Sequence, residues 1–280
     1  MSAAPPGGGF RRVLLALGPG SDYRAALAEA IRLAASLEAE LSTLFVEDTR
    51  LLDASRHSFA RRYTPMGAGW QQFGERELTQ AMRSLAEQVR RAVAEAAARD
   101  RLRWTFTVVR GDIEAEALSA AEEADLVVLG AGQDVLEAGL RPPSLARLGA
   151  RARERSVLYV RHRAPSAARL TIAYDGSPGA ARALAVAARL APPGELTVAL
   201  TGPGADASQA LEADAREVLG HDADSVEFFI RPNATAADLC DLSTSVGAGA
   251  LVMGADNPLL ADEAARQRLD EMTCRALVVR

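Results

Sequence analysis

The chain contains the same series of motifs twice, and this repetition limits the folds that it can form. The stretch RVLLALGPGSDYRAALAEAIRLA from Arg12 resembles LTIAYDGSPGAARALAVAARLA from Leu170. Further on, ADLVVLGA (124–131) resembles AGALVMGA (248–255), and SVLYVR (156–161) resembles RALVVR, the last six residues. Because the motifs recur in the same order, the sequence indicates a tandem duplication of one folding unit.

Apolar runs rich in β-branched residues alternate with helical patterns in each copy. Runs such as LVVL and ALVM are apolar at every position, which is typical of parallel strands covered on both faces. Helical crossovers between such strands favour right-handed βαβ units and a doubly wound sheet. The sequence therefore predicts an α/β fold with two tandem, doubly wound, five-stranded parallel sheets.

The pattern also gives approximate boundaries. The predicted strands of the first copy are near 12–17, 40–46, 104–110, 125–130 and 156–160, with helices near 22–37, 75–99, 112–123 and 144–153. Those of the second copy are near 170–174, 195–200, 225–230, 249–253 and 275–279. We expect a flexible leader over 1–10, a first domain over 11–163 and a second over 164–280, with the linker RHRAPSAAR around Pro165.

The composition excludes several classes of protein. The formal net charge of -5 disfavours a dedicated nucleic-acid binder. No run of about 18 apolar residues is present to span a bilayer. The N-terminus MSAAPPGGGF lacks the basic and apolar regions of a signal peptide, so we expect a cytoplasmic protein. The two cysteines, Cys240 and Cys274, cannot form a disulfide framework and fit buried small hydrophobic positions.

In these motifs the chain resembles the universal stress protein family in its tandem two-domain form. The resemblance runs from about Arg11 to Arg280. It rests on a first strand followed by DGS (IAYDGS, 172–177), a fourth strand that ends in glycine and a short fifth strand, VLYVR or ALVVR. It implies the adenine-nucleotide alpha-hydrolase-like fold and pairing through fifth strands. Here the two copies could pair with each other within one chain, and the resemblance leaves a homodimer open as well.

Nucleotide-binding members of that family carry a phosphate loop after the fourth strand: Gly, two residues, Gly, nine residues, Gly, then Ser or Thr. Its glycines let backbone N–H groups approach phosphate, and the next helix N-terminus favours negative charge. The corresponding positions are Gly130, Gln133, Pro143 and Ser144 in the first copy, and Gly254, Asn257, Gln267 and Arg268 in the second. Most of the glycines are replaced and Pro143 has no N–H donor, so both loops are predicted to be degenerate.

The resemblance also implies an aspartate at the end of the first strand that contacts the adenine end of the nucleotide. Asp175 holds this position in the second copy, followed by Ser177 as a helix N-cap and Pro178 at the first helical position. Gly18 replaces it in the first copy, which we therefore expect to hold no triphosphate. Asp175 also fits a turn residue ahead of the cap, and both interpretations stay open.

No catalytic or metal-binding constellation is evident in the sequence. His57, His162 and His221 are scattered among predicted loops without ligand spacing, so we expect surface histidines and no metal site. No GxSxG or Walker lysine motif is present. A redox role for Cys240 and Cys274 would require that they meet in space, and they lack CxxC spacing.

Two segments are candidates for interactions. Residues 47–74 interrupt the first copy with a long loop containing aromatic residues, which either packs over its own sheet edge or binds a partner. Between Arg141 and Arg163, seven arginines face one acid, Glu154. This run either collects anions or forms a solvated helix face.

These observations lead to one main hypothesis and one alternative. The main hypothesis is a non-enzymatic, stress-associated binding or regulatory protein that holds no cofactor, has degenerate nucleotide sites and acts on an unidentified protein partner. The alternative is a sensor in which one site still binds ATP or another adenine nucleotide, with at most slow hydrolysis. Any such nucleotide is expected beside Asp175 and Gly254, at the carboxyl ends of the second copy's strands.

Overall fold

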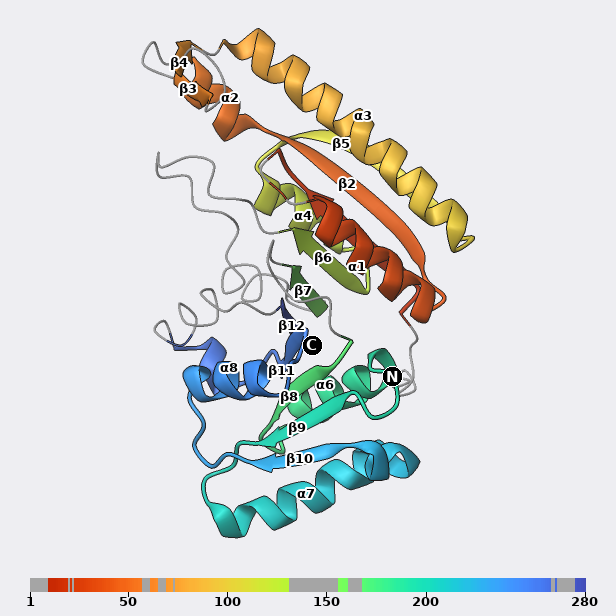
Figure 1. Cartoon of the computed structure of the whole chain (residues 1–280), viewed down its shortest axis with the longest axis vertical. Coiled ribbons are helices and arrows are strands. Elements are labelled where there is room, and N and C mark those ends of the chain that lie inside the picture. The colour runs from red at the N-terminus through yellow and green to blue at the C-terminus, as the bar shows by residue number, and fades with distance from the viewer. Residues whose placement is uncertain are drawn as a thin grey trace, which may run out of the picture.

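A computed structural model of the chain describes residues 10–19, 21, 23–56, 61–64, 69–72, 74–130, 156–160, 168–262, 265 and 275–280. These residues form one ten-stranded sheet with helices on both faces, and a separate small hairpin (Figure 1). The first copy makes one half of the sheet and the second copy makes the other half.

The strands of the first half are β1 (Arg12–Leu17), β2 (Glu40–Asp48), β5 (Trp104–Gly111), β6 (Leu126–Gly130) and β7 (Ser156–Val160). Its helices are α1 (Tyr23–Ser36), α2 (Thr49–Ser55), α3 (Glu75–Arg99) and α4 (Ile113–Ala121). The predicted strands and the predicted helices over 22–37, 75–99 and 112–123 are therefore present. The helix predicted over 144–153 lies outside the described residues.

The strands of the second half are β8 (Leu170–Tyr174), β9 (Leu196–Leu200), β10 (Glu227–Ile230), β11 (Ala250–Gly254) and β12 (Arg275–Val279). Its helices are α6 (Pro178–Leu190), α7 (Ala205–Leu219) and α8 (Ala236–Ser245), with 3-10 turns η1 (Gly220–Ser225) and η2 (Pro258–Leu260). The predicted start of α6 is confirmed, because Ser177 caps it by accepting from the amide of Ala180 (3.1 Å) and Pro178 occupies its first turn.

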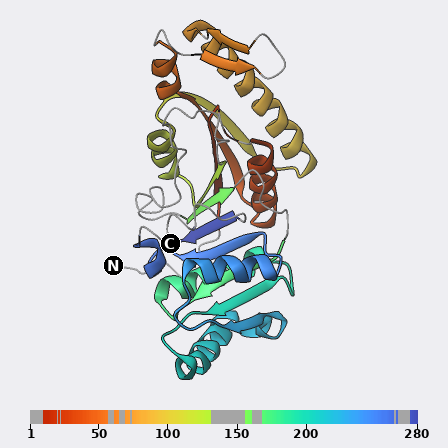
Figure 2. The same ribbon diagram turned by 60° about the vertical axis from the view of Figure 1, so that its left-hand side comes forward.

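The two half-sheets join into one, in the order β10-β9-β8-β11-β12-β7-β6-β1-β2-β5. Within each half all neighbouring strands are parallel, as the apolar runs predict. The two fifth strands, β7 and β12, pair antiparallel, with Val157, Leu158 and Tyr159 opposite Val278, Leu277 and Ala276. The expectation of two separate sheets is thus refined to one continuous sheet with an antiparallel joint at its centre (Figure 2).

The core is divided by the sheet into layers. One apolar cluster extends over both halves and holds residues of α1, α3, α6 and α7. On the opposite face, α4 covers a cluster in the first half and α8 covers another in the second half. Strand β1 contributes to both sides, because Val13 and Leu15 face the first cluster while Leu14 faces the cluster under α4. Among the described helices, none is long and apolar enough to cross a membrane.

The segment 47–74 differs from the long loop that the sequence suggests. Strand β2 continues to Asp48, α2 follows at once, and β3 (Arg61–Thr64) pairs antiparallel with β4 (Gly69–Gln72) as a hairpin. Helix α2 is tied to α3 by an ion pair of Arg56 with Glu75 (2.9 Å), and the hydrogen bond from Arg56 holds the pKa of Glu75 below its usual value. The segment therefore contains its own secondary structure and is anchored to the start of α3.

A buried ion pair connects the two halves across the central joint. The guanidinium of Arg275, on β12, lies 3.1 Å from the carboxylate of Glu29, on α1. Both side chains are 8% exposed. Arg32, one turn along α1, approaches the other carboxylate oxygen of Glu29 at 2.7 Å. Because a buried charge is costly without its partner, Glu29 fixes the position of α1 over the second half's last strand.

We predict that Glu29→Gln lowers the free energy of unfolding by about 3 kcal/mol or more, because Arg275 is left as a buried charge without its carboxylate. Urea unfolding of the whole chain measures this change. The matched control is Glu87→Gln, which removes an exposed pair of the same spacing with Arg90 on α3. That variant should change stability by at most about 0.5 kcal/mol. Equal effects of the two substitutions would show that the central ion pair has no special role.

Candidate functional site

Each half of the sheet has one place where ligands of doubly wound folds usually bind. The chain runs outward from β1 to β2 and β5, and then returns to the other side of β1 as β6. The second half repeats this path, with β8 and β11 on either side of its reversal point. Ligands of open α/β sheets bind at the carboxyl ends of the strands at such a reversal. The residues at these points are Gly18 and Gly130 in the first half, and Asp175 and Gly254 in the second.

In the first half, Ser21 spans the reversal point. Its hydroxyl accepts a hydrogen bond from the amide of Gly18 (3.0 Å) and donates to the carbonyl of Gly130 (3.4 Å). The side chain of one residue thus ties the end of β1 to the end of β6. The amide of Gly18 and the carbonyl of Gly130 are therefore already hydrogen-bonded within the chain.

Gly18, the counterpart of Asp175 in the first half, lies beside α4. Gly18 is buried, and a Cβ atom placed on it would lie 2.7 Å from Cδ1 of Ile113, the first residue of α4. An aspartate at position 18 would therefore require the terminal methyl group of Ile113 to move. An apolar side chain of α4 thus lies beside the position that holds the aspartate in the second half.

The glycine that ends β6 has a packing role. A Cβ on Gly130 would lie 3.2 to 3.3 Å from side-chain atoms of Leu17, Ser21 and Ala26. Of these, Leu17 ends β1, Ser21 precedes α1 and Ala26 is on α1. A side chain at position 130 would therefore be tightly packed, whether or not a ligand binds. Ser144, Gln133 and Pro143 lie outside the described residues.

In the second half, the predicted binding residues make local turns. Asp175 accepts a hydrogen bond from the amide of Ser177 (2.9 Å), as expected for a turn residue ahead of a helix cap. Asn257 caps η2 by accepting from the amide of Leu259 (3.0 Å), and its own amide donates to the carbonyl of Gly254 (3.1 Å). The structure brings Asp175 and Gly254 to the same reversal point, while Gln267 and Arg268 lie outside the described residues.

An acidic side chain lies directly at this second reversal point. The carboxylate of Asp256 accepts from the amide of Gly179, at the start of α6 (3.0 Å). A Cβ on Gly254 would lie 2.6 Å from the carbonyl carbon of Gly179 and 2.8 Å from an oxygen of Asp256. The N-terminus of α6 therefore touches β11 and is capped by a carboxylate of the chain itself. A carboxylate is the type of group that the positive end of a helix attracts.

Tyr174, the residue before Asp175, is fully buried and points into the core. Its hydroxyl is hydrogen-bonded to Asp214 on α7. Burial and this hydrogen bond raise the pKa of Tyr174, so the phenol stays protonated at physiological pH. Tyr174 thus fastens the end of β8 to α7 and contributes no charge to the crevice beside Asp175.

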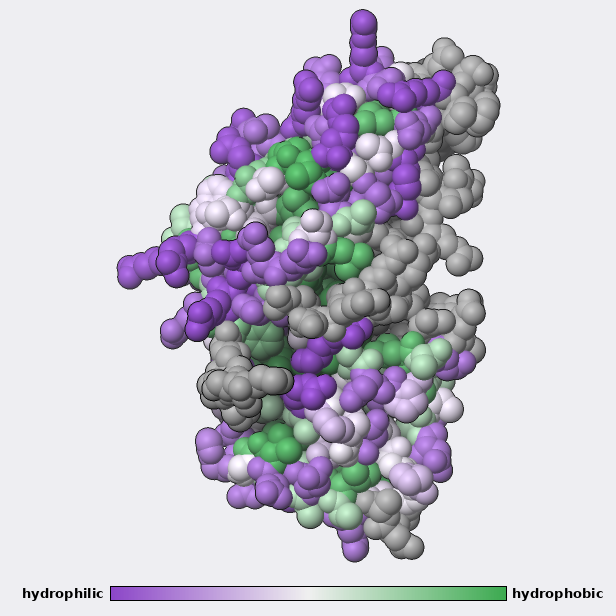
Figure 3. Space-filling model, turned by 180° about the vertical axis from the view of Figure 1, so that it is seen from behind, coloured by the Kyte–Doolittle hydropathy of each residue, from purple (hydrophilic) through white to green (hydrophobic). Residues whose placement is uncertain are grey.

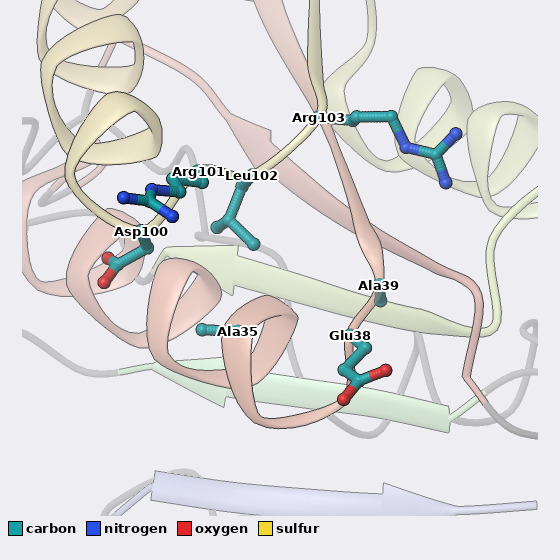
Figure 4. Close-up of a pocket in the computed structure, with 7 residues that line it drawn as sticks. All are labelled: Ala35, Glu38, Ala39, Asp100, Arg101, Leu102 and Arg103. Carbon is teal, nitrogen blue, oxygen red and sulfur yellow. The ribbon is translucent and has the colours of Figure 1, made fainter.

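A shallow cavity of about 320 Å³ lies at the other end of the first half. It is lined by Ala35, Glu38, Ala39, Asp100, Arg101, Leu102 and Arg103 (Figure 4). Ala35 lies in the last turn of α1, and the other residues lie between α1 and β2 or between α3 and β5, so the cavity opens at the amino ends of the strands. Figure 4 shows the side chain of Arg103 directed away from Asp100 and Arg101. The cavity is thus on the side opposite to the reversal point.

Within the described residues, the structure does not bring the other predicted site residues together. His221 has a side chain that is 94% exposed and lies 3.3 Å from Asp222, as expected for a surface histidine. Cys240 is partly buried on α8, whereas Cys274, His57, His162 and the arginines of the run from Arg141 to Arg163 lie outside the described residues. Within the described ranges, no group of His, Cys, Asp and Glu could hold a metal ion.

Comparison with known proteins identifies the class to which this architecture belongs. The sequence profile of the universal stress protein family matches residues 9–148. The chain therefore belongs to the universal stress protein family. A search of curated proteins finds no match.

Solved structures show the same arrangement over nearly the whole chain. A universal stress protein from Archaeoglobus fulgidus DSM 4304 superposes with a TM-score of 0.63 at 16% identity, over 96% of each chain. A candidate universal stress protein from Pseudomonas aeruginosa UCBPP-PA14 superposes with a TM-score of 0.56 at 17% identity, over 96% of this chain and 93% of that chain. At these identities the likeness concerns the fold alone.

The sequence analysis did not identify Ser21, Ile113 and Asp256, which lie at the two reversal points. Asp256 takes the place of Gly132 in the alignment of GADN with GAGQ, so a signal for it was present in the repeat. Ser21 follows β1 in the segment GPGS and corresponds to Pro178 in the second copy. Ile113 gives no such signal, because its contact with Gly18 joins segments that are distant in the chain.

We predict that Gly254→Ala destabilises the protein by about 1 to 3 kcal/mol, because the added methyl group meets the backbone of α6 at contact distances that cannot be relieved by a side-chain rotation. Thermal unfolding without added ligand measures this. The control is Gly74→Ala, since a Cβ at position 74 has no other atom within 4 Å. Gly74 is the N-cap of α3, where alanine is less favourable than glycine, so this variant should lose at most about 1 kcal/mol, from the cap and not from a clash. If Gly254 matters only for a ligand, Gly254→Ala will be no less stable than Gly74→Ala.

Proposed function

We propose that this universal stress protein is a non-enzymatic, stress-associated binding or regulatory module whose two nucleotide sites no longer hold ATP. The observation that carries the proposal is the carboxylate of Asp256, which binds the amide of Gly179 at the reversal point of the second half. The partner recognised by such a module would be a protein, and the inducing stress is open to experiment.

The second half is unfavourable to a phosphate for reasons of charge. A triphosphate at the carboxyl ends of β8 and β11 would lie near two carboxylates, those of Asp175 and Asp256. It would also have to displace Asp256 to reach the amide of Gly179. Each charge-assisted hydrogen bond that is lost costs about 1.5 to 3 kcal/mol, so even one such loss weakens binding by about tenfold or more.

The first half is unfavourable to a triphosphate because it offers little space for the family's aspartate and few free backbone N–H donors. Ser21 is hydrogen-bonded to the amide of Gly18 and the carbonyl of Gly130, and an apolar methyl group of Ile113 lies beside the position of the family's aspartate. In the sequence of the loop that follows, Gln133 and Pro143 stand where glycines would expose backbone amides. The combined losses would weaken a micromolar affinity to a millimolar one or worse.

The alternative function is an adenine-nucleotide sensor, and the position of Asp175 favours it. This residue follows β8 in the sequence DGS, where the family resemblance places the contact with the base. One of its carboxylate oxygens accepts from Ser177. In this alternative, Asp175 would hold the base and Asp256 would move away from Gly179 when the nucleotide binds.

Titration calorimetry with ATP separates the two functions. We predict that the wild-type chain binds ATP at millimolar concentration or more weakly and that freshly purified protein releases no adenine nucleotide in mass spectrometry. Asp256→Ala should bind ATP at least about tenfold more tightly, because the variant frees the amide of Gly179 and removes one negative charge. ATP hydrolysis should stay at the level of a blank reaction.

The matched control is Asp222→Ala, which removes an exposed carboxylate from η1, ahead of β10 and away from the reversal point. This variant should bind ATP as weakly as the wild type. The proposal fails if the wild-type chain binds ATP at micromolar concentration. If Asp175→Ala then abolishes that binding, the sensor is the correct function and its site is in the second half.

A further inference from the structure

The outer edge of β5 is an open edge of the sheet. This strand ends the strand order, and no other strand in the described part of the chain pairs with its outer side. It is eight residues long, WTFTVVRG, without proline or an acidic residue. The opposite end of the sheet, β10, is four residues long and begins with Glu227, which pairs with Arg169 (2.8 Å). Short strands and charges protect such edges, and β5 has the weaker protection.

The hydrogen bonds to β2 show which residues of β5 face outward. The amide of Leu41 donates to the carbonyl of Arg103 (2.9 Å), which fixes the pairing of the two parallel strands. Successive residues of a strand direct their N–H and C=O groups to opposite sides. The backbone groups of Trp104, Phe106, Val108 and Arg110 therefore point to the open edge.

The side chains of these residues are suited to a contact with an identical edge. Trp104 and Phe106 pack partly against the main core, and Val108 is 46% exposed. Arg110 is their only charged group, and it is paired with Glu47 at 2.7 Å. Seen from behind, a mostly hydrophilic surface is interrupted by apolar patches in both halves (Figure 3). Two such edges can meet without bringing unpaired like charges together.

We propose that two copies of this chain associate through their β5 edges, which pair antiparallel about a twofold axis at Thr107. In this register all four outward-facing residues find partners: Trp104 lies opposite Arg110 of the second copy, and Phe106 lies opposite Val108 of the second copy. The arrangement would extend the sheet across both chains. It pairs an aromatic ring with a guanidinium and two apolar side chains with each other.

A second copy fits this edge better than other arrangements of the same chains. The two fifth strands, β7 and β12, already pair within the chain and cannot serve as an external interface. An association of β5 with β10 of another copy would leave a free edge at each end and produce an open chain of molecules, whereas β5 with β5 closes as a dimer.

The first test is the mass of the particle in solution, measured by light scattering after gel filtration across a wide range of concentrations. The wild-type chain should have twice the monomer mass of 29.6 kDa. Val108→Lys should weaken self-association by at least about tenfold, because the ammonium group would be desolvated in the contact. The control is Ile230→Lys on β10, since Ile230 is also 46% exposed. It should leave the dimer intact.

The second test fixes the register by disulfide formation, in a background of Cys240→Ser and Cys274→Ser. Across the proposed axis, Thr107 faces Thr107 of the second copy as a non-hydrogen-bonded pair, whose Cα atoms are about 4.5 Å apart, a separation that a disulfide can bridge. Thr107→Cys should therefore give a cross-linked dimer on oxidation. Thr105→Cys, also exposed on the same face, faces Val109 of the second copy and should give severalfold less.

Three results would overturn the proposal. The first is a wild-type chain that is monomeric at every concentration, which would mean that this edge stays open or is covered within one chain. The second is a dimer that survives Val108→Lys or is lost in Ile230→Lys. The third is cross-linking of Thr107→Cys that does not exceed that of Thr105→Cys. Far-UV circular dichroism of each variant verifies that it is folded.

Discussion

The antiparallel pairing of β7 with β12 is the constraint on which the rest of this architecture depends. Each strand has a parallel neighbour on one side only, so each half alone would expose an apolar edge. Pairing the two strands gives hydrogen-bond partners to the backbone N–H and C=O groups along both edges. The long sheet then has two edges instead of four. The side chains at the joint are almost entirely apolar on both faces, which makes the central seam part of the core.

The antiparallel joint also determines where the helices lie. The strands of the two halves run in opposite directions where they meet, so the carboxyl ends of β7 and β12 lie at opposite ends of the central joint (Figure 2). The same relation places α1 and α6 on one face, where a single apolar cluster continues from one half to the other. Glu29 can reach Arg275 for this reason, and the ion pair has no equivalent in the repeat, because Ser156 stands at the position that corresponds to Arg275.

The sequence predicted the strands to within about two residues, because parallel strands covered on both faces are apolar at every position. The predicted strand ends were less accurate where polar residues continue a strand. Strand β2 was expected to end at Val46, yet it includes Glu47 and Asp48, which are buried and paired with Arg110 and Arg50. The hairpin of β3 and β4 was expected as loop, since its strands RRYT and GWQQ are short and contain no apolar run. Close approaches such as that of Ile113 to Gly18 depend on tertiary packing, which local patterns do not record.

The glycines that end β6 and β11 are one part of the family motif that both copies retain. At position 254 a side chain would collide with the backbone at the start of α6, so packing alone requires glycine there, whereas at position 130 a Cβ would lie 3.2 to 3.3 Å from side-chain atoms of Leu17, Ser21 and Ala26. The neighbouring positions carry no such requirement, and there the two halves differ. In the first half, Ser21, whose counterpart is Pro178, is hydrogen-bonded to the ends of β1 and β6. In the second half, Asp256, whose counterpart is Gly132, accepts from an amide at the start of α6. Different residues at different positions of the repeat therefore hold backbone groups at the two reversal points.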